Sequence, residues 1–254
     1  NEEIDRLRHN TTRSLYERND VIIVASVSCI YGLGLPESYF KGTIQIKVGD
    51  TLDRADLIKH LVMTQYTRND LVLERATFRA RGDILEIMPA YEKIITRIYF
   101  FGDEIEKIVK IDNLTGEIIE APESVLIYTE VHYIEYDETE DETISRIKTE
   151  LKNRVVELES QNKILESQRL QQRVKYDIEM IKEMGYCSGI ENYSRIIERR
   201  PIGSAPATLL DYFQGDFLTV IDESHVTLPQ LNGMYHGDAS RKNTLVEYGF
   251  RLPC

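Results

Sequence analysis

The chain has 254 residues, of which 42% are hydrophobic and 29% charged, and its formal net charge is −12. This composition describes a soluble globular protein of one to three domains, and because no apolar run approaches the roughly 18 residues of a membrane helix, we expect a cytoplasmic protein without a membrane partner. The acidic balance excludes nucleic-acid binding over the whole surface but leaves room for one local basic groove.

Residues 1 to 20 predict one or two amphipathic helices. Ile4, Leu7 and Leu15 recur at helical spacing and define an apolar stripe. The arginines between them predict a basic outer face, for which a solvated surface is the simpler interpretation; they are Arg6, Arg8, Arg13 and Arg18.

A continuous β-branched run, Val21 to Ala25, is typical of a buried central strand. Small hydroxyl residues, an aromatic and glycines follow it: Ser26, Ser28, Tyr31, Gly32 and Gly34. Such residues at the end of a parallel strand let a phosphate approach backbone N–H groups. An ordinary strand-to-helix turn, capped by one of the serines, is an equally good interpretation of the residues alone.

Residues 41 to about 130 predict an α+β unit. Polar and apolar residues alternate over 43–48, as in a half-exposed strand. From Asp53 to Tyr66 the apolar residues recur at helical spacing, after a cap at Thr51 or Asp53. Three later stretches read as strands separated by turns: ATFRARGDILEIMPA, IITRIYFFGDEIEKIVKID and SVLIYT. We therefore expect a twisted antiparallel sheet with one helix.

Within this unit, Arg79 and Arg81 are two residues apart on a strand and so project from the same face, and Arg68 precedes them closely. Guanidinium groups clustered on a sheet face suggest a docking patch for carboxylates of a partner protein. Local pairing is the alternative that the residue pattern by itself favours, and the available acids are Glu74, Asp83 and Glu86.

A helical stripe runs from about Glu142 to Met184, and Gly185 is a natural helix stop. One straight helix of that length would reach about 60 Å, so a bend or helical hairpin near Gln161 to Gln168 is expected. Tyr186, Tyr193 and Arg195 follow; they could stack on nucleobases or pack between domains, and packing is slightly favoured.

The apolar run Leu218 to Ile221 predicts a second short buried strand, which ends on Asp222 and Glu223. Two acids at the carboxyl end of such a strand could hold hydrated Mg²⁺ through Asp222 and orient a water through Glu223, as phosphoryl transfer requires. Solvated acids at an ordinary strand end are about equally expected. For His225, a lone histidine after two acids, the residue pattern favours a hydrogen-bonded surface group.

Several stretches together resemble the UvrB family of bacterial nucleotide excision repair. These are VIIVASVSCIYGLGLPESYF from Val21, QYTRND and RATFRARGD around the arginines, MGYCSGIENYSR from Met184, and DESHVTLPQLNGMYHGD with KNTLVEYGFRLP near the end. The chain departs from the family pattern at Ala76, where glycine is expected, and at Tyr99 to Phe101, where an acid is expected. Both departures bear on the details of partner binding.

The resemblance implies an α/β fold class: a partial RecA-like domain of the P-loop NTPase and helicase type, interrupted by two insertions. Its pieces would be 1–40 and 207–254, with an α+β UvrA-interaction domain at 41–133 and a helical insert at 134–206. It further implies ATP and Mg²⁺ as cofactors of the full-length protein, and UvrA, UvrC and damaged DNA as partners.

The residue roles that the resemblance implies fall into three groups. Asp222 and Glu223 would serve Mg²⁺ and the attacking water in a Walker B motif, with His225 coupling the nucleotide state to neighbouring segments. DNA backbone contacts would come from Ser26, Ser28 and Tyr31. UvrA docking would come from Arg68, Arg79 and Arg81.

Two competing interpretations stay open. The chain could be a UvrA-binding interaction fragment without catalysis of its own, or the related region of a transcription-repair coupling factor, although DESH and GFRLP so soon after the insert favour UvrB. The sequence contains no Gly-Lys pair and hence no GxxxxGK[ST] phosphate loop, and it reads as a piece of a longer protein. We therefore expect no ATPase activity from this chain by itself.

Overall fold

The computed structural model describes residues 2–132 and 137–253, apart from the side chains of residues 28, 30 and 137–140. The chain divides into two compact units. The first holds the described residues of 1–23, 35–134 and 211–214, and the second those of 24–34, 135–210 and 215–254. Among the described residues, no helix combines the length and the hydropathy needed to cross a membrane.

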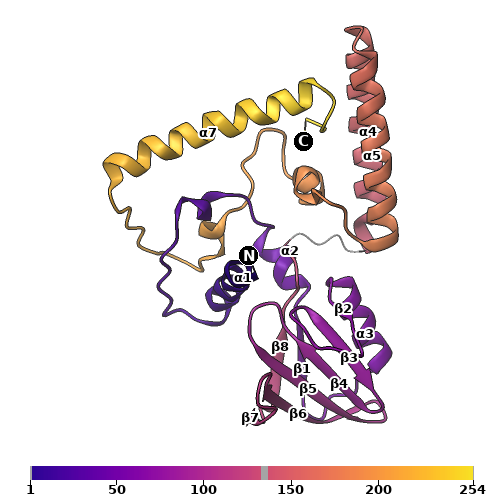
Figure 1. The fold of residues 1–254 in the computed structure, drawn as a ribbon, viewed down its shortest axis with the longest axis vertical. Helices are drawn as coiled ribbons and strands as arrows, with labels where there is room; N and C mark the ends of the chain where they lie inside the picture. Colours follow the sequence, from indigo (N-terminus) through magenta and orange to yellow (C-terminus); the bar gives the residue numbers. More distant parts are fainter. Residues whose placement is uncertain (1, 133–136, 254) are drawn as a thin grey trace. The chain divides into compact units, whose positions relative to one another are not determined.

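A six-stranded sheet forms the centre of the first unit (Figure 1). Its strands, in spatial order, are β2 Thr67–Arg68, β3 Thr77–Arg81, β4 Ile84–Met88, β5 Ile94–Phe101, β6 Glu104–Asp112 and β7 Ile118–Glu120. All neighbouring pairs are antiparallel except β2 with β3. The β3–β4 and β5–β6 connections are two-residue Gly-Asp turns, in which Gly82 and Gly102 adopt φ values of 58° and 62° that glycine tolerates best.

The larger hydrophobic cluster of this unit lies on one face of the sheet. Helix α3, Arg54–Met63, and the two-stranded ribbon of β1, Ile44–Lys47, with β8, Ser124–Ile127, supply buried residues to the same hydrophobic cluster as the sheet. The cluster is Ile46, Leu57, Leu61, Tyr66, Phe78, Leu85, Ile87, Ile98, Phe100, Ile105, Ile108, Val125 and Ile127. The expected antiparallel sheet with one helix is therefore confirmed, and so is the cap: the Asp53 carboxylate accepts from the Ala55 N–H at 2.7 Å.

Helix α1, Glu2–Glu17, exposes much of its expected apolar stripe. Ile4 and Leu7 are 50% and 48% exposed, and the helix instead buries His9, Thr12 and Leu15. The expectation of a basic outer face is wrong for Arg13, whose guanidinium pairs with Glu92 at 2.8 Å. Packing against the aromatic and acidic residues of the β unit decides which face turns inward, because helical spacing alone defines a stripe and not its partner.

Two antiparallel helices dominate the second unit: α4, Asp137–Ser160, and α5, Ile164–Met184 (Figure 1). The expected helical hairpin is confirmed, with Asn162 at φ 60° in the turn and Gly185 at φ 66° as the left-handed cap of α5. Two 3₁₀ segments, η1 Val27–Ile30 and η2 Ile190–Tyr193, the short helix α6 Ser194–Ile197 and the long helix α7 Ser224–Glu247 also belong to this unit. A third 3₁₀ segment, η3 Leu209–Tyr212, and the short helix α2 Pro36–Lys41 complete the helical elements.

We expected buried strands at Val21 to Ala25 and at Leu218 to Ile221, and both expectations are wrong for the described structure. Residues 21–26 and 216–221 belong to no strand, and Val24, Leu218 and Val220 are 97%, 89% and 82% exposed. Propensity makes a segment suitable for a sheet, but a strand persists only where a neighbouring strand accepts and donates its backbone hydrogen bonds. The RecA-like sheet thus stays a prediction.

Candidate functional site

The face of the sheet opposite the main core carries a row of charged residues. Antiparallel register places Arg79 of β3 opposite Glu86 of β4, and Glu86 opposite Arg97 of β5. Arg79 Nε donates to one carboxylate oxygen of Glu86, and Arg97 Nη2 donates to the other at 2.7 Å. The Glu86 side chain is only 6% exposed, so a nearly buried carboxylate is held between two guanidinium groups.

This arrangement sets the charge state of Glu86. Burial by itself raises the pKa of the carboxyl, but the hydrogen bonds from Arg79 and Arg97 outweigh it and hold the pKa below its ordinary value. Glu86 is therefore an anion at neutral pH, and local pairing, one of our two interpretations of the arginines, is confirmed for Arg79.

Arg68 and Arg81 are organised differently, by Asp70. Arg68 Nε donates to the Asp70 carboxylate at 3.0 Å, and Arg81 Nη2 donates to the Asp70 backbone carbonyl. The hydrogen bonds from Arg68 and then from the Ala80 N–H keep the pKa of Asp70 below its usual range. Both arginines face solvent, next to the exposed Leu71 (86%), so cationic and apolar groups together are available to a partner.

The acids that end the apolar run lie together at the start of α7. The Asp222 carboxylate accepts from the Glu223 N–H at 3.0 Å, and its carbonyl accepts from Thr227 Oγ1 at 2.9 Å. His225 Nδ1 lies 3.4 Å from a Glu223 oxygen, and Glu223 adopts a left-handed φ of 45°. The side chains of Asp222, Glu223 and His225 are all exposed.

This donor set fits Mg²⁺ only in a limited way. Across residues 2–132 and 137–253, no group of three or more His, Cys, Asp or Glu side chains is arranged to hold a metal ion. The Asp222 carboxylate already accepts one backbone N–H, and an exposed carboxylate of this kind suits a hydrated cation held through water better than a fully protein-ligated one. The described residues thus suit a contact with a magnesium ion through one of its bound waters.

The predicted DNA contacts lie around η1. Ser26 precedes this 3₁₀ turn, and its carbonyl accepts from the Cys29 N–H at 3.0 Å. Tyr31 follows the turn and is 51% exposed, whereas the side chain of Ser28 falls outside the described residues. The geometry here is that of a tight strand-free turn followed by an exposed aromatic side chain.

Two residues of the YCSGIENYSR segment pack, as slightly favoured, but against the helices of their own unit rather than between domains. Tyr193 is 4% exposed and its hydroxyl donates to Asp177 at 2.7 Å, while Arg195 forms an ion pair with Glu150. Asp177 also accepts from Arg173 Nε at 3.0 Å. This network joins the segment to both helices of the hairpin, so Tyr193 and Arg195 are not available to stack on nucleobases.

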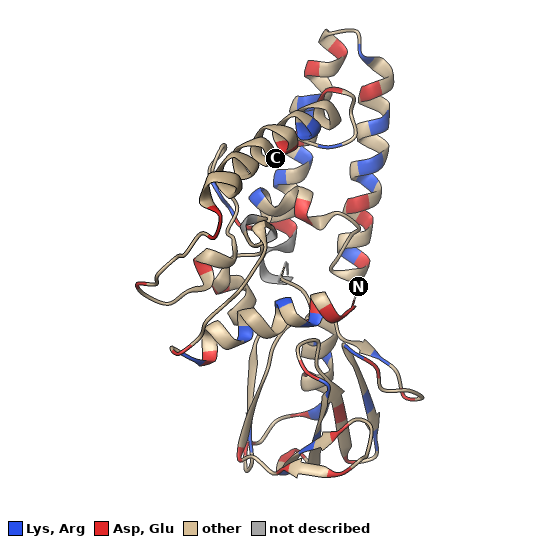
Figure 2. Ribbon diagram, turned by 60° about the vertical axis from the view of Figure 1, so that its left-hand side comes forward, with Lys and Arg blue, Asp and Glu red and all other residues tan. Residues whose placement is uncertain are grey.

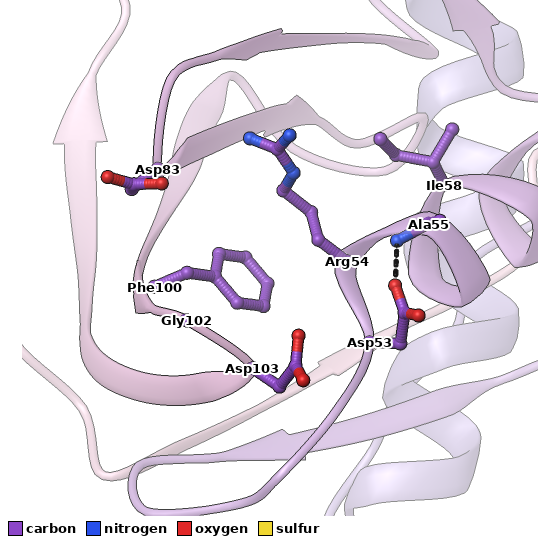
Figure 3. A pocket seen from close by; sticks show the side chains of 8 residues that line it. All are labelled: Asp53, Arg54, Ala55, Ile58, Asp83, Phe100, Gly102 and Asp103. Atoms are coloured by element: carbon purple, nitrogen blue, oxygen red, sulfur yellow. Dashed lines mark hydrogen bonds between the residues drawn. The ribbon is translucent and has the colours of Figure 1, made fainter.

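A polar hollow of about 290 Å³, which no sequence pattern predicted, lies at the start of α3 (Figure 3). Its walls come from α3 and from the two Gly-Asp turns of the sheet, and they consist of Asp53, Arg54, Ala55, Ile58, Asp83, Phe100, Gly102 and Asp103. The repeated Gly-Asp turn was the only sequence signal, and it predicts a tight turn rather than a site.

Comparison with known families matches two consecutive parts of the chain. Residues 44–133 match the family described as UvrB interaction domain, and residues 138–199 match the UvrB third helical domain. The first range contains the six-stranded sheet with its arginine row, and the second contains the helical hairpin with α6.

Whole-chain relatives give the same result. The chain is 54% identical over 253 residues to the UvrABC system protein B of Gloeobacter violaceus, 55% over 253 residues to that of Mycobacterium tuberculosis, and 54% over 254 residues to that of Staphylococcus aureus. Each alignment covers 100% of this chain but only 37%, 35% and 38% of the relative. The chain therefore spans somewhat more than a third of the length of these relatives.

Proposed function

This chain belongs to the UvrB family, and on that premise we propose that it is part of a nucleotide excision repair subunit that UvrA loads onto damaged DNA. The observation that carries the proposal is the match of residues 44–133 to the UvrB interaction domain, a range in which the structure shows a complete sheet and core. Identity of 54–56% over the whole chain supports the same assignment for the remaining residues.

UvrA docking would use Arg79 and Arg81 of β3 together with Arg68 at the end of the neighbouring edge strand β2. Arg68 and Arg81 are exposed beside Leu71 and would contact carboxylates of UvrA directly. Arg79 is three-quarters buried and bound to Glu86, so its role would combine holding the sheet face in shape with presenting its remaining N–H groups to the partner.

The motor function would involve the residues around α7. Asp222 would hold Mg²⁺ through water and Glu223 would orient the attacking water in an ATP site, with His225, which contacts Glu223, relaying the nucleotide state. When bound, Mg²⁺ and ATP supply charge neutralisation and the transferable phosphoryl group. The pieces 1–40 and 207–254 would complete a RecA-like domain, within which Ser26, Ser28 and Tyr31 face the DNA strand. Strand probing there would prepare the lesion for UvrC.

A second candidate is a UvrA-binding interaction module that performs no catalysis by itself. One observation favours it: the sheet that carries the arginines has a closed hydrophobic core formed entirely by residues between Ile46 and Ile127. The two candidates share the docking step and differ in ATP turnover.

Calorimetric titration of this chain with the UvrB-binding domain of UvrA tests the shared step. We expect binding by the wild type and a loss of about tenfold or more in affinity for Arg81→Glu combined with Arg68→Glu, because exposed charge pairs contribute up to about 1 kcal/mol each and reversal also adds repulsion. Lys59→Glu is the matched control, because Lys59 lies on α3, which covers the opposite face of the sheet, and is 78% exposed.

Unchanged affinity of the double variant would show that these arginines do not contact UvrA. Absence of binding by a folded wild type would refute the UvrA assignment altogether. ATP turnover by the wild type that Asp222→Asn abolishes would reject the purely interacting module.

A further inference from the structure

A lysine-lined groove runs between the two helices of the α4–α5 hairpin. Its volume is about 560 Å³. Four lining residues come from α4 and five from α5; they are Lys148, Leu151, Lys152, Val155, Gln171, Lys175, Ile178, Glu179 and Lys182. Figure 2 shows how often Lys and Arg recur along these two helices.

Helical spacing accounts for the composition of the groove. Leu151 and Val155 are four residues apart, as are Lys148 and Lys152, so each pair lies on one strip of α4. Ile178 supplies the facing apolar residue from α5. Because Leu151 and Ile178 are 9% and 6% exposed, they form an apolar floor, and the lysines, which are all exposed, form the rim.

The lysines of this groove differ from the other cations of the hairpin. Arg146, Arg154 and Arg173 each pair with an acid of their own helix, at 2.6 to 3.0 Å. In contrast, none of the ion pairs formed by the described side chains of this unit involves Lys148, Lys152, Lys175 or Lys182. Glu179 is the single acid of the lining. A chain with a net charge of −12 thus concentrates four positive charges around one apolar strip.

The chemistry of the lining selects the kind of occupant. Aliphatic floor residues between charged rims suit a helix that inserts apolar side chains and places acids on either flank. A single-stranded nucleic acid would instead use aromatic platforms and arginines, and the lining contains neither. We propose that this groove docks an acidic amphipathic helix of a partner protein, independently of the docking face on the sheet.

The test uses the whole chain and a designed probe. The probe is a fluorescein-labelled helical peptide of about 18 residues, long enough to populate a helix, with leucine at positions i, i+3, i+4 and i+7 and glutamate on the flanks. Fluorescence anisotropy should show binding that weakens as salt increases, because exposed charge pairs are screened. Lys148→Gln with Lys175→Gln should reduce the affinity about tenfold.

Matched controls make the result specific. Lys47→Gln with Lys107→Gln removes the same charge from exposed positions on the β unit and should leave the affinity unchanged. A peptide with lysine in place of glutamate should not bind, and neither should one with alanine in place of leucine. Circular dichroism melting of each variant checks that the hairpin is folded, and the neutral glutamine substitutions avoid adding repulsion to it.

Equal affinity of the groove variant and the control variant would overturn the proposal. Tighter binding of a twenty-residue oligothymidine than of the acidic peptide, lost in the groove variant, would assign the groove to nucleic acid and overturn it as well. So would concentration-dependent dimerisation that the groove variant abolishes, because the occupant would then be a second copy of the chain.

Discussion

Replacing Arg79 by glutamate should destabilise the sheet, whereas replacing Arg81 by glutamate should not. Arg79 contacts Glu86, whose side chain is 6% exposed, while Arg81 is an exposed residue that donates to the backbone carbonyl of Asp70. The two residues lie two positions apart on the same face of β3, so they provide a matched pair for separating docking from stability.

The magnitude follows from the surroundings of Glu86. Removing one partner of a buried ion pair costs about 3–5 kcal/mol, because a charge is left without compensation. Arg97 continues to hold Glu86, which places the expected cost for Arg79→Glu near the lower value, about 3 kcal/mol. For Arg81→Glu we expect a change within about 0.5 kcal/mol, which is normal for an exposed position.

Native-state hydrogen exchange of the β3, β4 and β5 amides measures this difference, since it reports on the sheet separately from the helical unit. The double variant Arg79→Glu with Glu86→Gln should recover part of the loss, because it removes the repulsion between the two carboxylates. Equal protection in Arg79→Glu and wild type would show that the Arg79–Glu86 pair does not stabilise the sheet, and an equal loss in both single variants would show that burial of Glu86 is not the reason.

Three further predictions concern stability. Burial, with the charges of Arg75 and Arg8, lowers the pKa of His9 to about 4 from its ordinary 6.5; the unfolded chain therefore binds an extra proton between these values, and the free energy of unfolding should fall as the pH drops from 6.5 to 4, by up to about 1.4 kcal/mol per pH unit. Glu130, whose pKa burial raises to about 7, acts in the opposite sense as the pH falls, so the measurement is the difference between wild type and His9→Phe, whose unfolding should depend less steeply on pH. Ala76 has a left-handed φ of 59°, so Ala76→Gly should raise the melting temperature, with a gain of about 1 kcal/mol; an unchanged or lower value would contradict the strain. Gly249→Ala would place a methyl group 2.2 Å from the Glu166 carbonyl at φ 70° and should cost about 1–3 kcal/mol, which urea denaturation of the helical unit would detect as a lower midpoint.

Local patterns predicted much of the architecture. Alternation of polar and apolar residues predicted β1, and stretches bounded by turn residues predicted β3 to β6 and β8. The cap, expected at Thr51 or Asp53, predicted the start of α3. The helical hairpin followed from length, because a single helix from 142 to 184 would be too long for a compact domain. These features depend on neighbours in the sequence, and so the sequence was sufficient to predict them.

Only part of the candidate site could be predicted from such local patterns. Two-residue spacing predicted that Arg79 and Arg81 share a face, but three acids were equally available as partners. The register of β3 with β4 selects Glu86, and the burial of that carboxylate results from the packing of the whole sheet. The lysine groove needed the antiparallel pairing of α4 with α5, which brings Lys148 and Lys175 to one opening although they are distant in sequence.

Residue types at short spacing were enough to predict most strands of the first unit, the helix after Asp53 and the helical hairpin with its glycine cap at Gly185. Tertiary contacts, in contrast, determine whether the runs that include Val24 and Val220 form strands and which face of α1 is buried. The physical reason is common to both: β-propensity and amphipathicity state what a segment could bury or pair, whereas backbone hydrogen bonds and apolar burial exist only where a second segment supplies the partner.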